Sequence, residues 1–180
     1  MEQLYAPWRI EWIRREERNP DVEGCVFCAL PDREADRESR IVARSAHAYV
    51  LLNNYPYNPG HLMVIPYEHT GDYGDLDDDV LLDHARLKAR TLDALRAAFD
   101  PDGFNAGLNL GVGSGGSITE HLHTHVVPRW QGDTNFLPVL SGTKVIVEAL
   151  EDTYDELHAA FAEQAGTAVE GDGTAVRIEE

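Results

Sequence analysis

Positive charge is scarce in this sequence of 180 residues. Only 15 side chains are Lys or Arg, against 32 Asp and Glu, and the formal net charge is -17. Non-specific affinity for nucleic acid comes from cationic side chains that displace the counterions of the phosphates. An anionic membrane surface attracts cationic segments in the same way. The charge therefore argues against nucleic acid and against a membrane surface as partners.

Lysine in particular is almost missing, since only Lys88 and Lys144 occur. Abundant acidic residues with few lysines suit a cytoplasm of high ionic strength, where salt screens the repulsion between like charges. Codon usage rich in G and C also favours Arg over Lys, so the lysine deficit alone is compatible with both explanations. The large acidic excess favours a halophilic composition.

Long apolar runs, a leader segment and a set of cysteines are missing as well. No apolar run approaches the ~20 residues that a transmembrane helix needs. The N-terminus lacks the basic and apolar segments of a signal peptide. Two cysteines, Cys25 and Cys28, cannot form the disulfide framework of a small secreted domain. We therefore expect a cytoplasmic protein, and 43% hydrophobic residues are enough for a sizeable core.

The apolar pattern predicts one α+β domain with a mostly antiparallel sheet. Residues 77–99 carry a rough apolar stripe at helical spacing and predict a long helix, and residues 144–164 predict a C-terminal helix. Strands are predicted at residues 40–44, 47–52, 61–66, 104–110 and about 121–127. We expect an N-terminal arm at residues 1–18, the main domain at 19–164, and a disordered, acidic and Gly-rich tail at 165–180.

Three histidines alternate with other residues in the run His121-Leu122-His123-Thr124-His125. Because side chains alternate between the two faces of a strand, these histidines are expected on one face. Three imidazoles in a row are costly to bury as core, which disfavours a chance cluster. A metal site of the His-x-His type is a competing interpretation, since imidazole is a common zinc ligand.

The run resembles the His-φ-His-φ-His-φ-φ signature of the histidine triad (HIT) family of nucleotide hydrolases and transferases, where φ is an apolar residue. Residues 53–66 and the glycine-rich residues 109–117 resemble the family's upstream strand-loop-strand and its phosphate-facing loop. The motifs are specific in combination. Residues 4–9 and 129–136 are similar to the branch of dinucleoside polyphosphate phosphorylases. The resemblance implies a HIT-like fold.

The resemblance also implies catalytic roles. His123 would be the nucleophile that attacks the α-phosphorus and carries the nucleotidyl group, a role that suits a neutral imidazole near pH 7. His125 and His61 would donate hydrogen bonds to the α-phosphate oxygens, where charge accumulates. A backbone carbonyl would fix the tautomer of His123.

Further residues match positions at which the family binds its substrate. Asn53 matches a ribose ligand, and Trp130 is either a wall of the nucleotide pocket or a packing residue at the strand end. Phosphate contacts are implied for Asn109, Gly115, Gly116 and Ser117, where glycine permits close backbone approach. Ser117 stands where many hydrolase members carry Gln, which favours the phosphorylase branch. Lys144 is a candidate polyphosphate contact or a surface charge.

Cys25 and Cys28 form a Cys-x-x-Cys pair, which alone is compatible with a redox pair, with buried thiols or with half of a zinc site. Zinc-containing members of the family use a set that corresponds here to Cys25, Cys28, His69 and His121. The resemblance therefore implies one structural Zn²⁺ at these four residues. No organic cofactor is expected.

These observations predict an enzyme that cleaves a nucleotide phosphoanhydride through a nucleotidyl-His123 intermediate. Diadenosine tetraphosphate or a similar dinucleoside polyphosphate is the expected substrate, with inorganic phosphate rather than water as the favoured acceptor. The alternatives are a nucleoside phosphoramidase, a non-catalytic purine nucleotide-binding protein, and a hydrolase whose catalytic metal binds all three triad histidines. Uridylyl transfer is disfavoured, because that class carries Gln at the position of His125. Members of the family form homodimers, and a homodimer is expected here.

Overall fold

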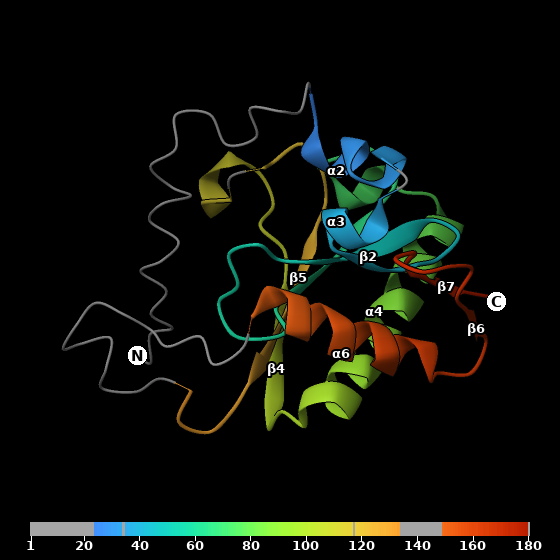
Figure 1. Ribbon diagram of the computed structural model, residues 1–180. Helices are drawn as coiled ribbons and strands as arrows, with labels where there is room; N and C mark the ends of the chain where they lie inside the picture. Colours follow the sequence, from blue (N-terminus) through green and yellow to red (C-terminus); the bar gives the residue numbers. More distant parts are fainter. Residues whose placement is uncertain (1–23, 34, 117, 134–148, 180) are drawn as a thin grey trace.

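The structure of the chain, a computed structural model, describes residues 24–33, 35–116, 118–133 and 149–179 (Figure 1). The predicted arm at residues 1–18, Ser117 and Lys144 lie outside these residues. The described chain forms one seven-stranded sheet in the order β4-β5-β3-β2-β1-β7-β6. Its strands are β1 (Ile41–Arg44), β2 (Ala48–Leu52), β3 (Leu62–Pro66), β4 (Gly103–Gly107), β5 (Thr124–Arg129), β6 (Thr167–Ala168) and β7 (Val176–Ile178).

Neighbouring strands pair antiparallel, except for β1 and β7, which pair parallel. The predicted α+β class with a mostly antiparallel sheet is therefore confirmed. The central strand β3 pairs with β2 in the register Val50↔Val64 and with β5 in the register Met63↔His125. This pairing places the strand that carries His125 directly beside the strand that follows His61.

The helices are α2 (Val26–Ala29), α3 (Asp36–Ser39), α4 (Asp78–Phe99) and α6 (Leu150–Ala162), with 3-10 turns at Pro31–Arg33, Tyr73–Asp75 and Val112–Ser114. Helix α4 agrees with the long helix that the sequence predicted. Its first turn contains Asp78 and Asp79, where the helix dipole favours negative charge. It ends at Phe99, and the next residue, Asp100, adopts a left-handed φ of 44° just before Pro101. Helix α6 falls within the predicted C-terminal helix; residues 144–148 are outside the described part.

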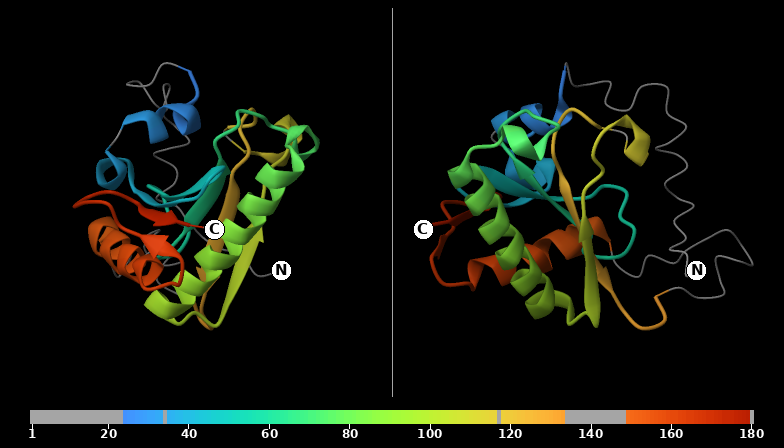
Figure 2. Two further views of the ribbon diagram at one scale, coloured as in Figure 1. Left: turned by 90° about the vertical axis from the view of Figure 1, so that its right-hand side faces the viewer. Right: turned by 180° about the vertical axis from the view of Figure 1, so that it is seen from behind.

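Both faces of the sheet are covered. The side chains of Val50, Leu52 and Val64 pack into a core with residues of α4 and α6, such as Leu87 and Leu157. The views of Figure 2 show α4 (green) and α6 (orange) side by side, with the short N-terminal helices (blue) apart from them.

On the opposite face, Tyr49, Leu51 and Met63 pack against Phe27 of α2. Every residue of β2 and β3 is buried, because side chains on both faces of these strands contact other elements.

The C-terminal segment corrects the sequence-based prediction. Residues 165–179 are ordered where a disordered tail was expected, and β7 extends the sheet beside β1. Ala175 and Val176 are only 3% and 0% exposed, and the N–H of Ala175 donates to Asp36 at 2.8 Å. Buried apolar side chains and pairing of β7 with β1 and β6 hold this segment in place, despite its acidic and Gly-rich composition.

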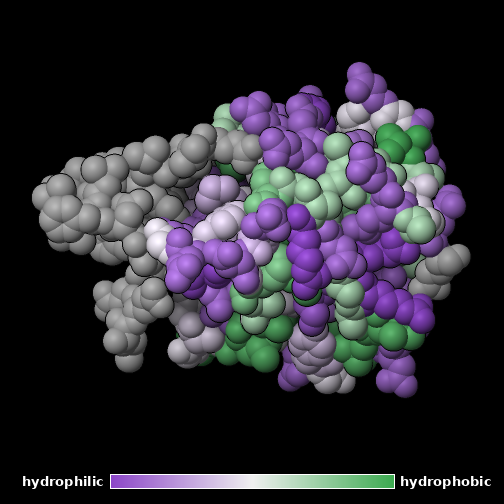
Figure 3. Space-filling model, turned by 90° about the horizontal axis from the view of Figure 1, so that it is seen from below, coloured by the Kyte–Doolittle hydropathy of each residue, from purple (hydrophilic) through white to green (hydrophobic). Residues whose placement is uncertain are grey.

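The described surface carries hydrophilic residues interspersed with smaller apolar patches, as one face of the molecule shows in Figure 3. Its most exposed large apolar side chain is Val112, at 90% exposure, in the glycine-rich loop that follows β4. No helix in the described ranges is both long and apolar enough to cross a bilayer.

Candidate active site and metal site

Only one of the three triad histidines, His125, lies within β5. The strand begins at Thr124, three residues later than predicted, so His121 and His123 lie in the segment that leads into it. The residues between the histidines face α4: Leu122 packs against Val80, and the hydroxyl of Thr124 lies 3.2 Å from Nε2 of His84. The alternation that the sequence predicted therefore separates the histidines from the α4 side of the sheet.

His123 is 6% exposed, and one of its ring nitrogens has a defined partner. Its Nδ1 lies 2.9 Å from the backbone carbonyl oxygen of His121, which can only accept a hydrogen bond. The hydrogen is therefore on Nδ1, and Nε2 carries a lone pair. Burial lowers the pKa of His123, although the hydrogen bond to His121 opposes this shift. At neutral pH the ring is thus uncharged, with a fixed tautomer and a lone pair on Nε2.

His61 and His125 form a directed pair. Nδ1 of His61 accepts a hydrogen bond from the backbone N–H of Tyr57 at 3.1 Å, so the His61 hydrogen is on Nε2. That nitrogen lies 2.9 Å from Nδ1 of His125 and donates to it. The hydrogen of His125 is therefore on its Nε2. The rings of His123 and His125 lie 5.0 Å apart, centre to centre.

His61 is enclosed by protein groups. The side chain is fully buried, and both ring nitrogens bond to protein groups. Its Nε2–H orients the ring of His125, which keeps its own Nε2–H available as a hydrogen-bond donor. The predicted donation from His61 to a phosphate stays a prediction.

The predicted substrate residues belong to three loops: the loop before β3, the glycine-rich loop after β4, and the segment after β5. Asn53 is 7% exposed; its Oδ1 accepts from the N–H of Tyr55 at 2.8 Å, and its Nδ2 lies 3.6 Å from Sδ of Met63. The Asn53 side chain therefore stabilises the conformation of its own loop. The ring of Tyr57 stacks on His61 at 4.9 Å between ring centres.

The glycine-rich loop after β4 is exposed and folds back on itself. Gly111 and Gly115 have φ values of 70° and 80°, which glycine adopts without a Cβ clash. A Cβ at Gly116 would lie 2.9 Å from the Cβ of Asn109, so this position also requires close backbone approach. Trp130 follows β5 and is half-buried. The structure thus brings Asn109 and Gly116 together, whereas Ser117 is outside the described residues.

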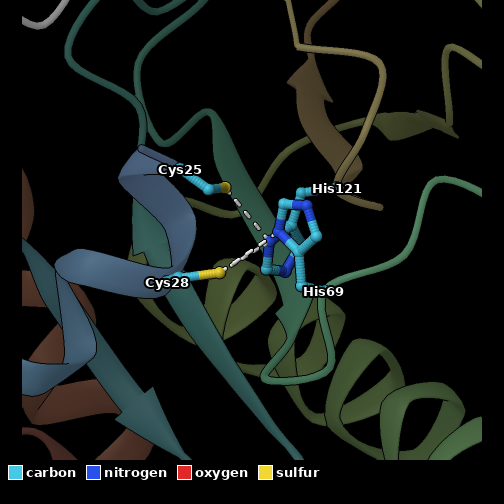
Figure 4. Close-up of side chains that lie close together, drawn as sticks. All are labelled: Cys25, Cys28, His69 and His121. Atoms are coloured by element: carbon cyan, nitrogen blue, oxygen red, sulfur yellow. Dashed lines mark hydrogen bonds between the residues drawn. The ribbon is translucent and has the colours of Figure 1, made fainter. Parts of the chain in front are cut away.

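Cys25, Cys28, His69 and His121 form one cluster, in which all four potential ligand atoms lie within 4.8 Å of one another (Figure 4). Nδ1 of His121 lies 3.3 Å from Sγ of Cys25 and 3.5 Å from Sγ of Cys28. Nδ1 of His69 lies 3.3 Å from Sγ of Cys28. Two sulfurs and two imidazole nitrogens around a tetrahedral Zn²⁺ would be separated by about 3.5 Å. The four residues can therefore hold a metal ion.

His121 is prepared as a ligand by a hydrogen bond on its other nitrogen. Nε2 donates to the carbonyl oxygen of Pro66 at 2.8 Å, which leaves the lone pair on Nδ1, facing the two sulfurs. Burial lowers the pKa of His121, so the ring stays neutral. Burial and the neighbouring Cys25 raise the pKa of the Cys28 thiol to about 11. Metal binding must therefore displace the Cys28 proton.

An antiparallel sheet with three alternating histidines at the start of an inner strand defines the histidine triad class of proteins. The family model described as the HIT domain matches residues 34–132, and the chain belongs to this family. The chain is also 43% identical over 171 residues to the AP-4-A phosphorylase of Mycobacterium tuberculosis, over 91% of this chain and 86% of that protein. The resemblance stated from the motifs and the predicted enzyme class, a HIT-type nucleotidyl hydrolase or transferase, are confirmed.

Solved structures agree with this assignment. A zinc-bound histidine triad family protein from Mycobacterium smegmatis matches with a TM-score of 0.64 and 28% identity, over 78% of this chain and 94% of that one. A hypothetical histidine triad nucleotide-binding protein from Sulfolobus tokodaii matches with a TM-score of 0.61 and 29% identity, over 77% and 90% of the two chains. The predicted HIT-like fold is therefore confirmed.

Sequence reasoning did not identify Phe27 as part of the site. This residue lies between the two cysteines, is 4% exposed, and its ring centre lies 5.6 Å from that of His121 and 5.0 Å from that of His123. An aromatic residue inside the Cys-x-x-Cys pair was the available signal. The carbonyl of His121 could not be identified in the same way, because every residue has one.

Proposed function

We propose that the protein cleaves diadenosine tetraphosphate, or a similar dinucleoside polyphosphate, through a nucleotide bound covalently to Nε2 of His123. The observation that carries this proposal is the fixed tautomer of His123, whose Nδ1–H is held by the His121 carbonyl. A neutral imidazole with its lone pair on Nε2 is a competent nucleophile at neutral pH. Similarity to the mycobacterial AP-4-A phosphorylase supports the choice of substrate.

In the first step, Nε2 attacks the α-phosphorus and the bond to the bridging oxygen breaks, so that ATP leaves and AMP remains on His123. Nε2–H of His125 donates to a non-bridging oxygen as negative charge builds up there. His61 holds His125 in the tautomer that can donate. In the second step, an oxygen of inorganic phosphate attacks the same phosphorus, the P–N bond breaks, and ADP is released.

The remaining substrate contacts are proposed from the family motifs. Asn109, Gly115, Gly116 and Ser117 would bind phosphate through backbone N–H groups and the Asn side chain, because glycines allow close approach. Asn53 would serve the ribose through its loop. Trp130 would form a wall of the nucleotide pocket.

The metal of the Cys25, Cys28, His69 and His121 cluster is proposed to be one structural Zn²⁺. Two thiolates and two imidazoles at tetrahedral spacing are a donor set that zinc prefers. The zinc-bound relative of the same fold supports this choice. All four positions are taken by protein ligands, so the ion would connect α2 to the segment before β5 and would take no part in the reaction. Elemental analysis tests this: one zinc per chain is expected, and none in a Cys25→Ser/Cys28→Ser variant.

A homodimer is also proposed, with the outer edge of β4 as its interface. Strand β4 ends the sheet in the described part of the chain, and its residues 105–107 are exposed. A free strand edge is a ready template for pairing with a second copy. Sedimentation analysis at micromolar concentration tests this proposal. A monomeric protein would contradict it. A cytoplasmic location remains the expectation from composition.

The decisive test of the function is product analysis by mass spectrometry, in phosphate buffer and in phosphate-free buffer. With diadenosine tetraphosphate and phosphate, ADP and ATP are expected. AMP with ATP, or two ADP, would indicate hydrolysis instead. Faster cleavage of a nucleoside phosphoramidate would favour the phosphoramidase alternative.

The intermediate is tested separately by intact-protein mass spectrometry after a rapid quench. The wild type should gain one nucleoside monophosphate, and His123→Ala should gain none while still binding nucleotide. His47→Asn is the matched control, since His47 is a partly exposed histidine outside the site. Turnover by His123→Ala, or adduct formation on it, would refute the proposed nucleophile.

A further inference from the structure

The carboxylate of Asp133 receives hydrogen bonds from three directions just after β5. Its side chain is only 8% exposed. It accepts from Nε and Nη2 of Arg129 at 2.5 and 2.9 Å, from Nδ2 of Asn58 at 2.8 Å, and from the N–H of Trp130 at 3.3 Å. A single buried group therefore joins the end of β5, the turn that carries Trp130, and the loop before β3.

Asn58 connects Asp133 to the loop that holds His61. It is 2% exposed, and its Nδ2 also donates to the carbonyl oxygen of Pro128 at 2.9 Å. Its own carbonyl accepts from the backbone N–H of His61 at 3.2 Å. The neighbouring N–H, that of Tyr57, donates to Nδ1 of His61. The turn that Asn58 anchors therefore supplies the contact that fixes the tautomer of His61, and through it that of His125.

We propose that Asp133 is a positioning residue: through Asn58 it holds the turn that orients the His61–His125 pair, and it fixes Trp130 on the same framework. The kinetic consequence rests on the proposed function, whereas the structural consequence for the two imidazoles does not.

The negative charge of Asp133 matters as well as its shape. All of its partners are donors, and an ionised carboxylate only accepts. An amide in its place would turn one acceptor into an NH₂ group, which would face the donors of Arg129 or Asn58. In a largely buried position such an unmatched pair of donors is costly, so the turn would move rather than keep it. Asp133→Asn is therefore a disruptive change despite its nearly equal size.

A matched control contacts the same turn from the connection between α4 and β4. Oδ2 of Asp102 accepts from the backbone N–H of Gln131 at 2.6 Å, so it too secures residues 130–133. Asp102 is exposed, and none of its described hydrogen bonds reaches Asn58. Asp102→Asn therefore removes a carboxylate that contacts the same turn, without affecting the contact to His61.

The closing experiment measures both variants by ¹⁵N NMR of the histidine side chains and by steady-state kinetics. In the wild type, the ring nitrogens of His61 and His125 should report the Nε2–H tautomers and their mutual hydrogen bond. Asp133→Asn should lose this signature and lower kcat about tenfold or more, with a smaller change in KM, because misplacement of a charge-stabilising donor acts on the transition state. Asp102→Asn should keep the signature and stay within about twofold of wild-type kcat.

Asn58→Ser provides a second route should Asp133→Asn fail to fold, since it breaks the same connection from its other end. It should also lose the imidazole signature, and its kinetic effect should not add to that of Asp133→Asn in a double-mutant cycle. Unchanged imidazole signals in a folded variant, or an effect on KM alone, would overturn the proposal. Loss of the signature in a protein without phosphorolysis would uphold the positioning role and refute only the proposed reaction.

Discussion

Gly71 offers a sharp test of how the metal cluster is built, because a single methyl group there meets the protein backbone. A Cβ at this position would lie 2.3 Å from the carbonyl oxygen of Thr119 and 3.3 Å from Cα of Glu120. The Thr70 carbonyl next to it accepts from the N–H of Leu122 at 2.7 Å, so the two segments are already joined. One segment carries His69 and the other carries His121, and both contribute to the cluster.

The size of the effect follows from these distances. Relieving the overlap needs a shift of about 1 Å to reach ordinary contact, and a backbone carbonyl cannot rotate away as a side chain can. Metal–ligand distances tolerate only about 0.2 Å. Gly71→Ala should therefore lower zinc affinity about tenfold or more and destabilise the fold by about 1–3 kcal/mol.

Competition with a chromophoric chelator measures the zinc affinity, and thermal unfolding measures the stability. Gly74→Ala is the control, because a Cβ there would have its nearest contact at 3.4 Å, from Oδ1 of Asp72. If Gly71→Ala kept the zinc affinity of the wild type, the close approach of these two segments would not determine how the cluster binds its metal. Equal loss in both variants would show that any added methyl group in this loop disturbs it.

Three further predictions concern stability. Chelation of the metal should lower the melting temperature of the wild type by several degrees. The melting temperature of the Cys25→Ser/Cys28→Ser variant should not respond to chelator. A wild type that is insensitive to chelator would contradict the structural role of the ion. Truncation after residue 169 removes buried Ala175 and Val176 and should cost at least about 2 kcal/mol in urea unfolding, while an unchanged unfolding midpoint would mean that β7 contributes nothing. Burial lowers the pKa of His84 below its usual 6.5, so the unfolded chain binds this proton first and stability should fall as pH drops below about 6.5. The fall should be shallower in His84→Gln by up to about 1.4 kcal/mol per pH unit, and parallel curves from urea titrations at several pH values would refute that assignment.

The four potential metal ligands were identifiable from the sequence for a simple reason. Cysteine and histidine have few structural roles that require such spacing, so Cys25, Cys28, His69 and His121 stood out once the family motifs were recognised, and the structure brings them together. Helix α4 was equally readable, because its apolar stripe and its acidic first turn act locally. Both signals depend on side-chain type rather than on distant contacts.

Other features depend on long-range contacts and could not be read in this way. The ordering of β7 depends on β1, which lies more than a hundred residues earlier in the chain. The tautomer of His61 depends on the backbone N–H of Tyr57, which no residue pattern reports. Asn53 was expected to face a ligand, and only the fold reveals its bond to the N–H of Tyr55. The start of β5 was misplaced because the alternation of His121 and His123 is equally compatible with an extended segment before the strand.

The contact between His123 and the main chain of His121 has a genetic consequence. A carbonyl group is common to every amino acid, so no point substitution at position 121 can delete this acceptor outright. Exchange of His121 would remove a potential metal ligand yet leave the hydrogen-bond acceptor of His123 in the chain. Such an exchange can also displace the backbone carbonyl of residue 121. A mutational scan that measures only activity would ascribe the resulting loss to the missing metal ligand. The role of the carbonyl would therefore not be detected.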